Sequence, residues 1–252
     1  MTAVHRTEPP KVALITGGAV RVGKAIALEL AGAGLDVALT YHTSRDAACE
    51  TLAELRAMGG RAMLLEADLR EPDAPAEVVD AIAQRWGALD VLVNSAASFV
   101  FQDLQELSSD SFDAQVALNV RAPLLLAQAA APLLAQSAAG RIINIADASA
   151  SRPFKGQLVH SLTKAALVNL TRGLARELGP AIQCHAVIPG AVAPPQQGPS
   201  DLASRLTQLP IPREGTPRDV AEAVRFLATC TSFATGTILH IDGGDSCVGL
   251  SG

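Results

Sequence analysis

Seven short apolar segments alternate with longer helical candidates along the 252-residue chain, and this alternation constrains the fold more than any other feature. The apolar segments are 11–16, 36–41, 61–67, 89–94, 140–146, 182–188 and 236–242. The helical candidates between them are 22–33, 46–58, 74–85, 111–135, 157–178 and 217–228. Continuous apolar strands are typical of a parallel sheet that is covered on both faces. The pattern therefore predicts an α/β fold with one doubly wound parallel sheet and helices on both faces.

The chain shows no repeat and no interdomain linker, so we predict a single domain over residues 1–252, with 1–10 as a flexible tail. Segment 189–215 is rich in proline and has no clear place in the sheet. Long irregular segments of compact domains often close over a ligand, and 189–215 is therefore a predicted substrate loop. A plain surface excursion is the alternative.

Charge and cysteine content argue against several classes of protein. The net charge of -5 and the pI near 5.5 argue against a nucleic-acid partner. The N-terminus has no signal pattern, and no apolar run reaches the roughly 18 residues of a membrane span, so we expect no membrane. The four cysteines are far apart and no H-E-x-x-H is present. These observations predict a cytoplasmic protein without a metal site.

A glycine-rich turn, "TGGAVRVGKAIALEL" at residues 16–30, follows the first predicted strand and opens a helix. There Gly17 permits a tight turn and Gly23 lets the helix pack closely on the sheet, so that free amides face a pyrophosphate. Arg21 could add charge-assisted hydrogen bonds to a phosphate. The segment indicates a Rossmann-like dinucleotide site. A turn that serves packing alone, with a solvated Arg21, is the alternative.

The residues after the second predicted strand favour one form of the dinucleotide. No Asp or Glu stands where a carboxylate would bind the adenine ribose 2′-hydroxyl of NAD. His42, Thr43, Ser44 and Arg45 instead offer donors and positive charge for a 2′-phosphate. The sequence therefore predicts NADP(H) as the cofactor, with a solvated Arg45 at a helix start as the alternative.

Several motifs occur together in one order: "TGGAVRVG", Asp68 after the third strand, "NSAASF", Asn119, "HSLTK" and "PGAV". Together they resemble the short-chain dehydrogenase/reductase family over nearly the whole chain. Within it, Arg21, "YHTS", the "SF" after the fourth strand and Asp147 look like the pteridine reductase branch, whose members reduce dihydropterins or dihydrofolates with NADPH. The resemblance thus implies an NADPH-dependent reductase of a pterin-like or other small cyclic C=N or C=O substrate.

The resemblance also implies a role for each residue that matches a family motif. Its cofactor residues would be Gly17, Arg21, Val22 and Gly23 at the pyrophosphate, His42, Thr43, Ser44 and Arg45 at the 2′-phosphate, Asp68 and Leu69 at the adenine, Asn94, Ala96 and Lys164 at the nicotinamide ribose, and Pro189, Gly190 and Val192 beside the nicotinamide. Asn119 would sustain a water-linked proton path. The substrate contacts would be Arg21, Phe99, Asp147 and His160, with Phe99 stacking a flat ring against the nicotinamide.

Some of these residues have plainer alternatives, and the match is incomplete. Asp68 could only cap a turn, Asn119 could only satisfy a helix kink, and Phe99 could be ordinary core. Ser95 and Ala97 replace the second Asn and the Gly of the common N-N-A-G run. Pteridine reductases usually have Ser at the position of Ala97, which puts one substrate contact in doubt.

The largest departure from the family concerns its proton donor. A tyrosine normally stands four residues before the lysine, with a serine thirteen residues upstream of it, and here these positions hold His160 and Asp147. The spacing places His160 and Lys164 on one helix face. Lys164 would favour the neutral imidazole and Asp147 the cation. We expect His160 and Asp147 to be proton-donor candidates, because an imidazole titrates near neutral pH.

Other functions stay open from the sequence. They are a general carbonyl or 3-oxoacyl reductase that binds a flexible chain, an altered reaction in the same pocket, and a catalytically idle NADP(H)-binding or regulatory protein in which His160 marks the loss of the site.

The helices at 111–135 and 157–178 have extended Ala/Leu faces. Because these helices pair across subunits in the family, the resemblance implies a homotetramer.

Overall fold

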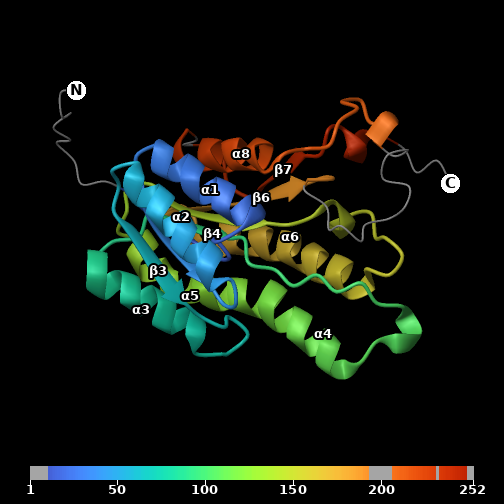
Figure 1. The fold of residues 1–252 in the computed structure, drawn as a ribbon, viewed down its shortest axis with the longest axis horizontal. Coiled ribbons are helices and arrows are strands. Elements are labelled where there is room, and N and C mark those ends of the chain that lie inside the picture. Colours follow the sequence, from blue (N-terminus) through green and yellow to red (C-terminus); the bar gives the residue numbers. More distant parts are fainter. Residues whose placement is uncertain (1–10, 193–205, 231–232, 249–252) are drawn as a thin grey trace.

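The computed structural model describes residues 11–192, 206–230 and 233–248, and its centre is one seven-stranded parallel sheet (Figure 1). The strands lie in the order β3-β2-β1-β4-β5-β6-β7, and every pair is parallel. They are β1 (Val12–Ile15), β2 (Asp36–Tyr41), β3 (Ala62–Glu66), β4 (Val91–Asn94), β5 (Gly140–Ile145), β6 (Ile182–Pro189) and β7 (Thr237–Ile241). The predicted doubly wound sheet is confirmed.

Helices cover both faces of the sheet, as predicted. They are α1 (Arg21–Gly32), α2 (Arg45–Ala57), α3 (Ala74–Trp86), α4 (Ser109–Val116), α5 (Ala122–Leu134), α6 (Leu158–Leu178) and α8 (Pro217–Thr229). Helices α1, α2 and α8 pack on one face, and α3, α5 and α6 pack on the other (Figure 1). The strand order reverses direction between β1 and β4, and ligands of such sheets bind outside the strands' carboxyl ends at that point.

The two cores follow from the period of two along each strand. In β1, Ala13 and Ile15 join the core beneath α1 and α8, whereas Val12 and Leu14 join the core beneath α3 and α5. All four side chains are at most 1% exposed. Because both faces of the strand are buried, its sequence is apolar throughout rather than alternating.

The predicted helix 111–135 is interrupted near its middle. A π-helical turn, Ala117–Arg121, separates α4 from α5 and contains Asn119. Pro123 follows at the start of α5 and has no N–H to donate to the carbonyl of Asn119 in the ordinary helical pattern. The wider turn brings the buried side chain of Asn119 to the carboxyl edge of the sheet, and the predicted helical stretch contains a π-helical turn that the sequence reading did not predict.

Among the described residues, the continuous run Ser109–Leu134 is long and apolar enough to span a membrane by length and composition alone. Asp110, Asp113 and Arg121 interrupt this run, so it is not an uninterrupted apolar stretch of the kind that the sequence expectation concerned. Leu126, Ala127, Ala130 and Leu134 of this run lie in the core against α3 and the sheet. Packing inside the domain accounts for their apolar character.

Candidate active site

The glycine-rich turn after β1 forms a cradle of main-chain atoms. Gly17 has a φ of 63°, and its N–H donates to the Thr40 hydroxyl at 3.2 Å. A Cβ on Gly23 would lie 2.2 Å from the carbonyl oxygen of Gly17, which no side chain can approach so closely. Glycine is therefore required at 23 for α1 to pack against the turn, whereas the sequence predicted close packing of the helix on the sheet.

The N-terminus of α1 is open to an anion. Val20 at the N-cap supplies no side-chain hydrogen bond, and the first turn contains no acidic residue. The positive end of the helix dipole therefore has no carboxylate in the first turn to offset it. Arg21 begins the helix with a φ of 51°, in the left-handed region, and is exposed beside the turn, as is the half-buried Val22. A pyrophosphate fits this arrangement.

The residues predicted for the adenine end gather at the ends of β2 and β3. His42, Thr43 and Arg45 are exposed, and Arg45 begins α2 directly after Ser44. His42 Nε2 lies 3.7 Å from the Asp68 carboxylate. Leu69 is buried next to Asp68. The structure therefore brings the predicted phosphate and adenine residues together.

Asp68 has a partner that the sequence reasoning missed. The Arg70 guanidinium holds its carboxylate at 2.6–3.1 Å through Nε and Nη2, and these hydrogen bonds lower the pKa of Asp68 to about 2. Arg70 stands only two residues away, so an Arg after the predicted adenine-binding Asp was the available signal. The pair leaves Asp68 charged at neutral pH.

Thr16 organises the loop after β4, and this function was also missed. Its hydroxyl oxygen accepts hydrogen bonds from the N–H groups of Ser95 and Ala96, each at 3.0 Å. The side chain of Asn94 donates to Asn144 Oδ1 at 2.8 Å within the sheet. The contact of Asn94 with a ribose stays a prediction, because its buried side chain serves the sheet in this structure.

Asn119 connects three segments at the centre of the site. Its Oδ1 accepts from Ser98 N–H at 2.8 Å, and its Nδ2 donates to the Ser98 carbonyl and to the Thr163 hydroxyl, both at 3.0 Å. Asn119 is 1% exposed. The loop after β4, the turn between α4 and α5, and α6 are thereby fixed to one another.

His160 lies on the first turns of α6 against the loop after β4. Its Nδ1 is 3.2 Å from the Ser98 carbonyl oxygen, and its ring meets the Phe99 ring edge to face at a centroid distance of 5.0 Å. Burial and the nearby Lys164 lower the pKa of His160 below its usual value, while Asp147 and the Ser98 contact oppose this shift. The imidazole is 5% exposed, and Phe99 is 42% exposed rather than core.

Lys164 and Asp147 flank His160 in different ways. Lys164 Nζ donates to the Ile145 carbonyl at 2.8 Å, and its burial lowers the pKa of the ammonium group to about 8. Asp147 Oδ1 accepts from Ser149 N–H at 2.8 Å. The hydrogen-bonding partner of His160 Nδ1 is therefore the Ser98 carbonyl and not Asp147, which acts on the imidazole through its charge.

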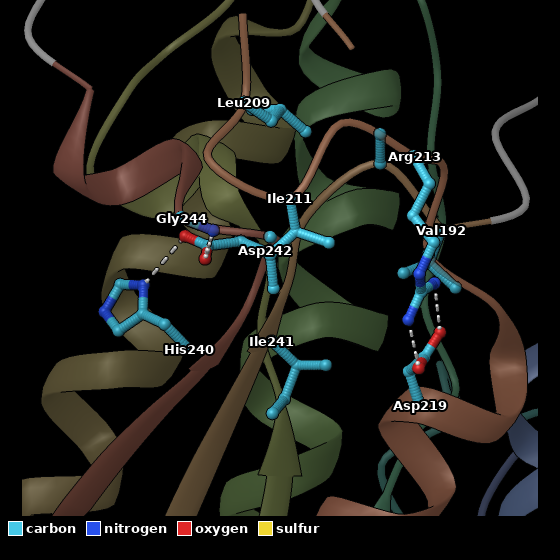
Figure 2. A pocket seen from close by; sticks show the side chains of 12 residues that line it. Val192, Leu209, Ile211, Arg213, Asp219, His240, Ile241, Asp242 and Gly244 are labelled. Carbon is cyan, nitrogen blue, oxygen red and sulfur yellow. Dashed lines mark hydrogen bonds and ion pairs between the residues drawn. The ribbon is translucent and has the colours of Figure 1, made fainter. Parts of the chain in front are cut away.

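The described ends of the predicted substrate loop line a pocket of about 300 Å³ beside the ends of β6 and β7 (Figure 2). Val192 pairs with Gly215, and Gly190 packs against Asp242. Figure 2 shows the Arg213–Asp219 pair on one side and His240 with Asp242 on the other. Pro189 ends β6 and leads into this wall. Residues 193–205 of the predicted loop lie outside the described residues.

Comparisons with known proteins identify the family of the chain. A family described as Enoyl-(Acyl carrier protein) reductase matches residues 18–246. A 3-oxoacyl-[acyl-carrier-protein] reductase of Synechocystis is 32% identical over 237 residues, which cover 93% of this chain and 96% of that protein.

Two solved structures extend the likeness to the fold. A short-chain dehydrogenase from Burkholderia cenocepacia, in complex with NADP, is 38% identical with a TM-score of 0.88, covering 94% of this chain and 98% of that one. A blue fluorescent protein from a metagenomic library, in complex with NADPH, is 36% identical with a TM-score of 0.86 and the same coverage of both chains. The chain therefore belongs to the short-chain dehydrogenase/reductase family.

Proposed function

We propose that this protein is an NADP(H)-dependent oxidoreductase that exchanges hydride with a pterin-like or other small cyclic C=N or C=O substrate. The observation that carries the proposal is the position of His160. Its imidazole is buried one helical turn before Lys164 and contacts Phe99, on the helix whose lysine serves the cofactor in this family. We therefore place the hydride acceptor beside this proton-exchanging group.

The cofactor proposal rests on the open N-terminus of α1 and on His42 and Arg45. The predicted residues would hold NADP(H) through its pyrophosphate, 2′-phosphate and nicotinamide ribose, and the bound cofactor supplies or accepts the hydride. The turn at Gly17 and Gly23 fits a pyrophosphate because side chains are excluded there. Two structural neighbours in complex with NADP or NADPH support this assignment.

The proposed proton chemistry belongs to His160 and Asp147. In a reduction, a protonated imidazole would deliver its proton to the substrate oxygen or nitrogen as the hydride arrives. Asp147 opposes the lowering of the pKa of His160 and so favours the charged form that can donate. Lys164, buried and bound to the Ile145 carbonyl, would orient the ribose.

The partly exposed ring of Phe99 supports a flat substrate. An aromatic face beside the proton donor can stack a cyclic ligand, whereas a flexible chain gains little from it. The test is NADPH oxidation with dihydrobiopterin, dihydrofolate and cyclohexanone, comparing wild type with Phe99→Leu. We expect KM for the ring substrates to rise about tenfold in this variant, the equivalent of 1.4 kcal/mol. An unchanged KM would remove Phe99 from the substrate site.

A second candidate is a carbonyl reductase of 3-oxoacyl substrates, which the Synechocystis relative favours. Acetoacetyl-CoA and the pterin panel would be compared by kcat/KM. Preference for the acyl substrate, with no effect of Phe99→Leu on it, would replace the ring substrate in the proposal.

The catalytically idle alternative is tested at His160 itself. We expect His160→Ala to lose NADPH turnover while it still binds NADPH. Unchanged turnover in this variant would remove His160 from the mechanism. Activity that is absent in the wild type and gained in His160→Tyr would favour an idle NADP(H)-binding protein.

We also infer a cytoplasmic homotetramer that needs no membrane or nucleic acid. Phe112, Leu124, Leu158 and Leu162 on α4, α5 and α6 are 37–51% exposed, which favours an apolar interface between subunits. Light scattering after size-exclusion chromatography checks this assembly, and a monomer would contradict it.

A further inference from the structure

We propose that the Ser98 carbonyl holds neutral His160 in the tautomer with the proton on Nδ1, so that Nε2 offers a lone pair and the resting site recognises the hydroxyl of a secondary alcohol. This inference rests on the proposed function, in which His160 exchanges a proton with the substrate. It adds that, at neutral pH, His160 is in the form that accepts a proton from the substrate rather than the form that donates one.

The first argument is the hydrogen-bonding capacity of the two atoms. A carbonyl oxygen can only accept, so an imidazole nitrogen bonded to it at 3.2 Å must carry a proton. A neutral imidazole has one N–H, and Nε2 is then an acceptor. No described residue forms a hydrogen bond with Nε2.

The second argument is that hydrogen bonds hold the Ser98 carbonyl in its orientation toward His160. Asn119 binds both main-chain groups of Ser98, and its amide also donates to Thr163 on α6, the helix that carries His160. The acceptor and the imidazole are therefore fixed in one frame. Asn119 is a positioning residue for the tautomer, since it touches Ser98 rather than the ring.

The third argument is the charge around the imidazole. Lys164 approaches from the same helix, Asp147 approaches from the loop after β5, and Ser98 and Phe99 on the loop after β4 are uncharged. Burial and Lys164 outweigh Asp147, and together they lower the pKa of His160 below the ordinary value of an imidazole, which already lies below 7. The neutral form therefore predominates at pH 7.

A bare Nε2 prepares the oxidative direction. As the alcohol is oxidised, its O–H bond would break and the proton would move to Nε2, while the hydrogen on the same carbon would leave with the C–H electron pair as hydride to the oxidant NADP⁺. The carbon–oxygen double bond forms, and His160 becomes an imidazolium with an N–H on each nitrogen. The reverse reaction must begin from that imidazolium, which is the minor form at pH 7.

The direct test is ¹⁵N NMR of the histidine-labelled full chain without cofactor, with His160→Gln used to assign its signals. At pH 7 we expect a protonated Nδ1, an unprotonated Nε2 and a titration midpoint below 6.5. A proton on Nε2 alone, or an imidazolium at pH 7, would overturn the proposal. This measurement needs no turnover, so its result tests the tautomer independently of the proposed function.

A matched pair of asparagine variants tests the role of Asn119. We expect Asn119→Ala to release the Ser98 carbonyl and to give His160 a mixture of tautomers. Asn144→Ala removes another buried asparagine, bonded to Asn94 and Thr171, and should leave the tautomer unchanged. The same tautomer in both variants would show that Asn119 does not position it.

Rates in both directions add a second measurement, with cyclohexanol and NADP⁺ or cyclohexanone and NADPH as probes. Because the reaction releases a proton, the ratio of the oxidation rate to the reduction rate changes with pH for any catalyst. The informative quantity is therefore the pH at which each pH–rate profile changes slope. We expect the oxidation rate to rise with pH and to become constant before pH 6.5 is reached. We expect the reduction rate to fall tenfold per pH unit above the pH at which its profile changes slope. His160→Tyr should move this pH upward, because a phenol titrates near 10. Reduction that stays constant through pH 7 would contradict the proposal, whereas no turnover on any substrate of the panel would contradict only the proposed function.

Discussion

Asn119 and Ser98 are joined by two hydrogen bonds, from Ser98 N–H to Oδ1 at 2.8 Å and from Nδ2 to the Ser98 carbonyl at 3.0 Å. Because the amide is buried, its removal leaves both main-chain groups without this partner. We expect Asn119→Ala to lower the free energy of unfolding by about 2–6 kcal/mol, since two main-chain groups lose a partner and each unsatisfied buried group costs roughly 1–3 kcal/mol. Urea denaturation of wild type and variant measures this loss, and a change below about 0.5 kcal/mol would show that water replaces the amide.

Gly23→Ala tests the contact between α1 and the phosphate turn. The added Cβ would lie 2.2 Å from the Gly17 carbonyl oxygen, so helix and turn must separate. We expect stability to fall by about 3 kcal/mol and NADPH affinity to fall with it. Fluorescence titration with NADPH and urea denaturation measure the two effects.

Gly173→Ala is the matched control for this variant. A Cβ on Gly173, within α6, would meet nothing within 4 Å. We expect this change to stabilise the protein by roughly 0.4–1 kcal/mol and to leave NADPH binding unchanged. Equal effects of the two substitutions would refute the steric account of Gly23.

Arg45→Ala tests the preference for the 2′-phosphate. Arg45 is exposed at the start of α2, where its charge can reach a phosphate beside His42. We expect Kd for NADPH to rise about tenfold, or 1.4 kcal/mol, with little change for NADH. Arg56→Ala in the last turn of α2 is the control and should change neither constant. A parallel loss of NADH affinity in Arg45→Ala would place Arg45 elsewhere in the site.

His185 makes stability depend on pH. It is fully buried on β6, no described residue bonds either ring nitrogen, and burial with the nearby Arg141 lowers its pKa to about 4. The unfolded chain, with a pKa near 6.5, then binds more protons between pH 6.5 and 4, so stability falls as pH falls through that window. The loss approaches roughly 3 kcal/mol at pH 4.

His185→Leu isolates this contribution. We expect the variant to lose much less stability than the wild type between pH 6.5 and 4, by urea denaturation at several pH values. His240→Gln changes a more exposed histidine and is the control. A wild-type slope retained in His185→Leu would assign the pH dependence to other groups.

Lys164→Met separates stability from function. Burial lowers the pKa of Lys164 to about 8 from 10.5, so the folded protein opposes a charge that the unfolded chain carries freely. The free energy of unfolding therefore rises with pH between 8 and 10.5. At pH 7 the full cost of burying the charged ammonium group still lowers it. We expect Met to raise the free energy of unfolding at pH 7 by up to about 3 kcal/mol, while NADPH turnover falls. A destabilised variant would show that the bond to the Ile145 carbonyl outweighs the burial of the charge.

The sequence by itself determined the succession of strands and helices along the chain, the position of the glycine-rich turn, and the family. Those features depend on local periodicity and on backbone freedom at Gly17 and Gly23, which can be recognised along the chain. It also identified His160 and Asp147 as the unusual residues of the site. The sequence spacing could place His160 and Lys164 on one helix face because that relation lies within a single element.

Only the tertiary structure decided which main-chain group bonds His160 and which residues hold that group in place. Ser98, Asn119 and Thr163 come from three segments, and their mutual hydrogen bonds depend on the π-helical turn that interrupts the predicted helix. The same holds for Thr16, whose hydroxyl supports a loop 79 residues away in the sequence. Main-chain acceptors such as the Ser98 carbonyl are common to every residue, so no sequence pattern marks the one that selects a tautomer. Its identity follows from packing across the carboxyl edge of the sheet.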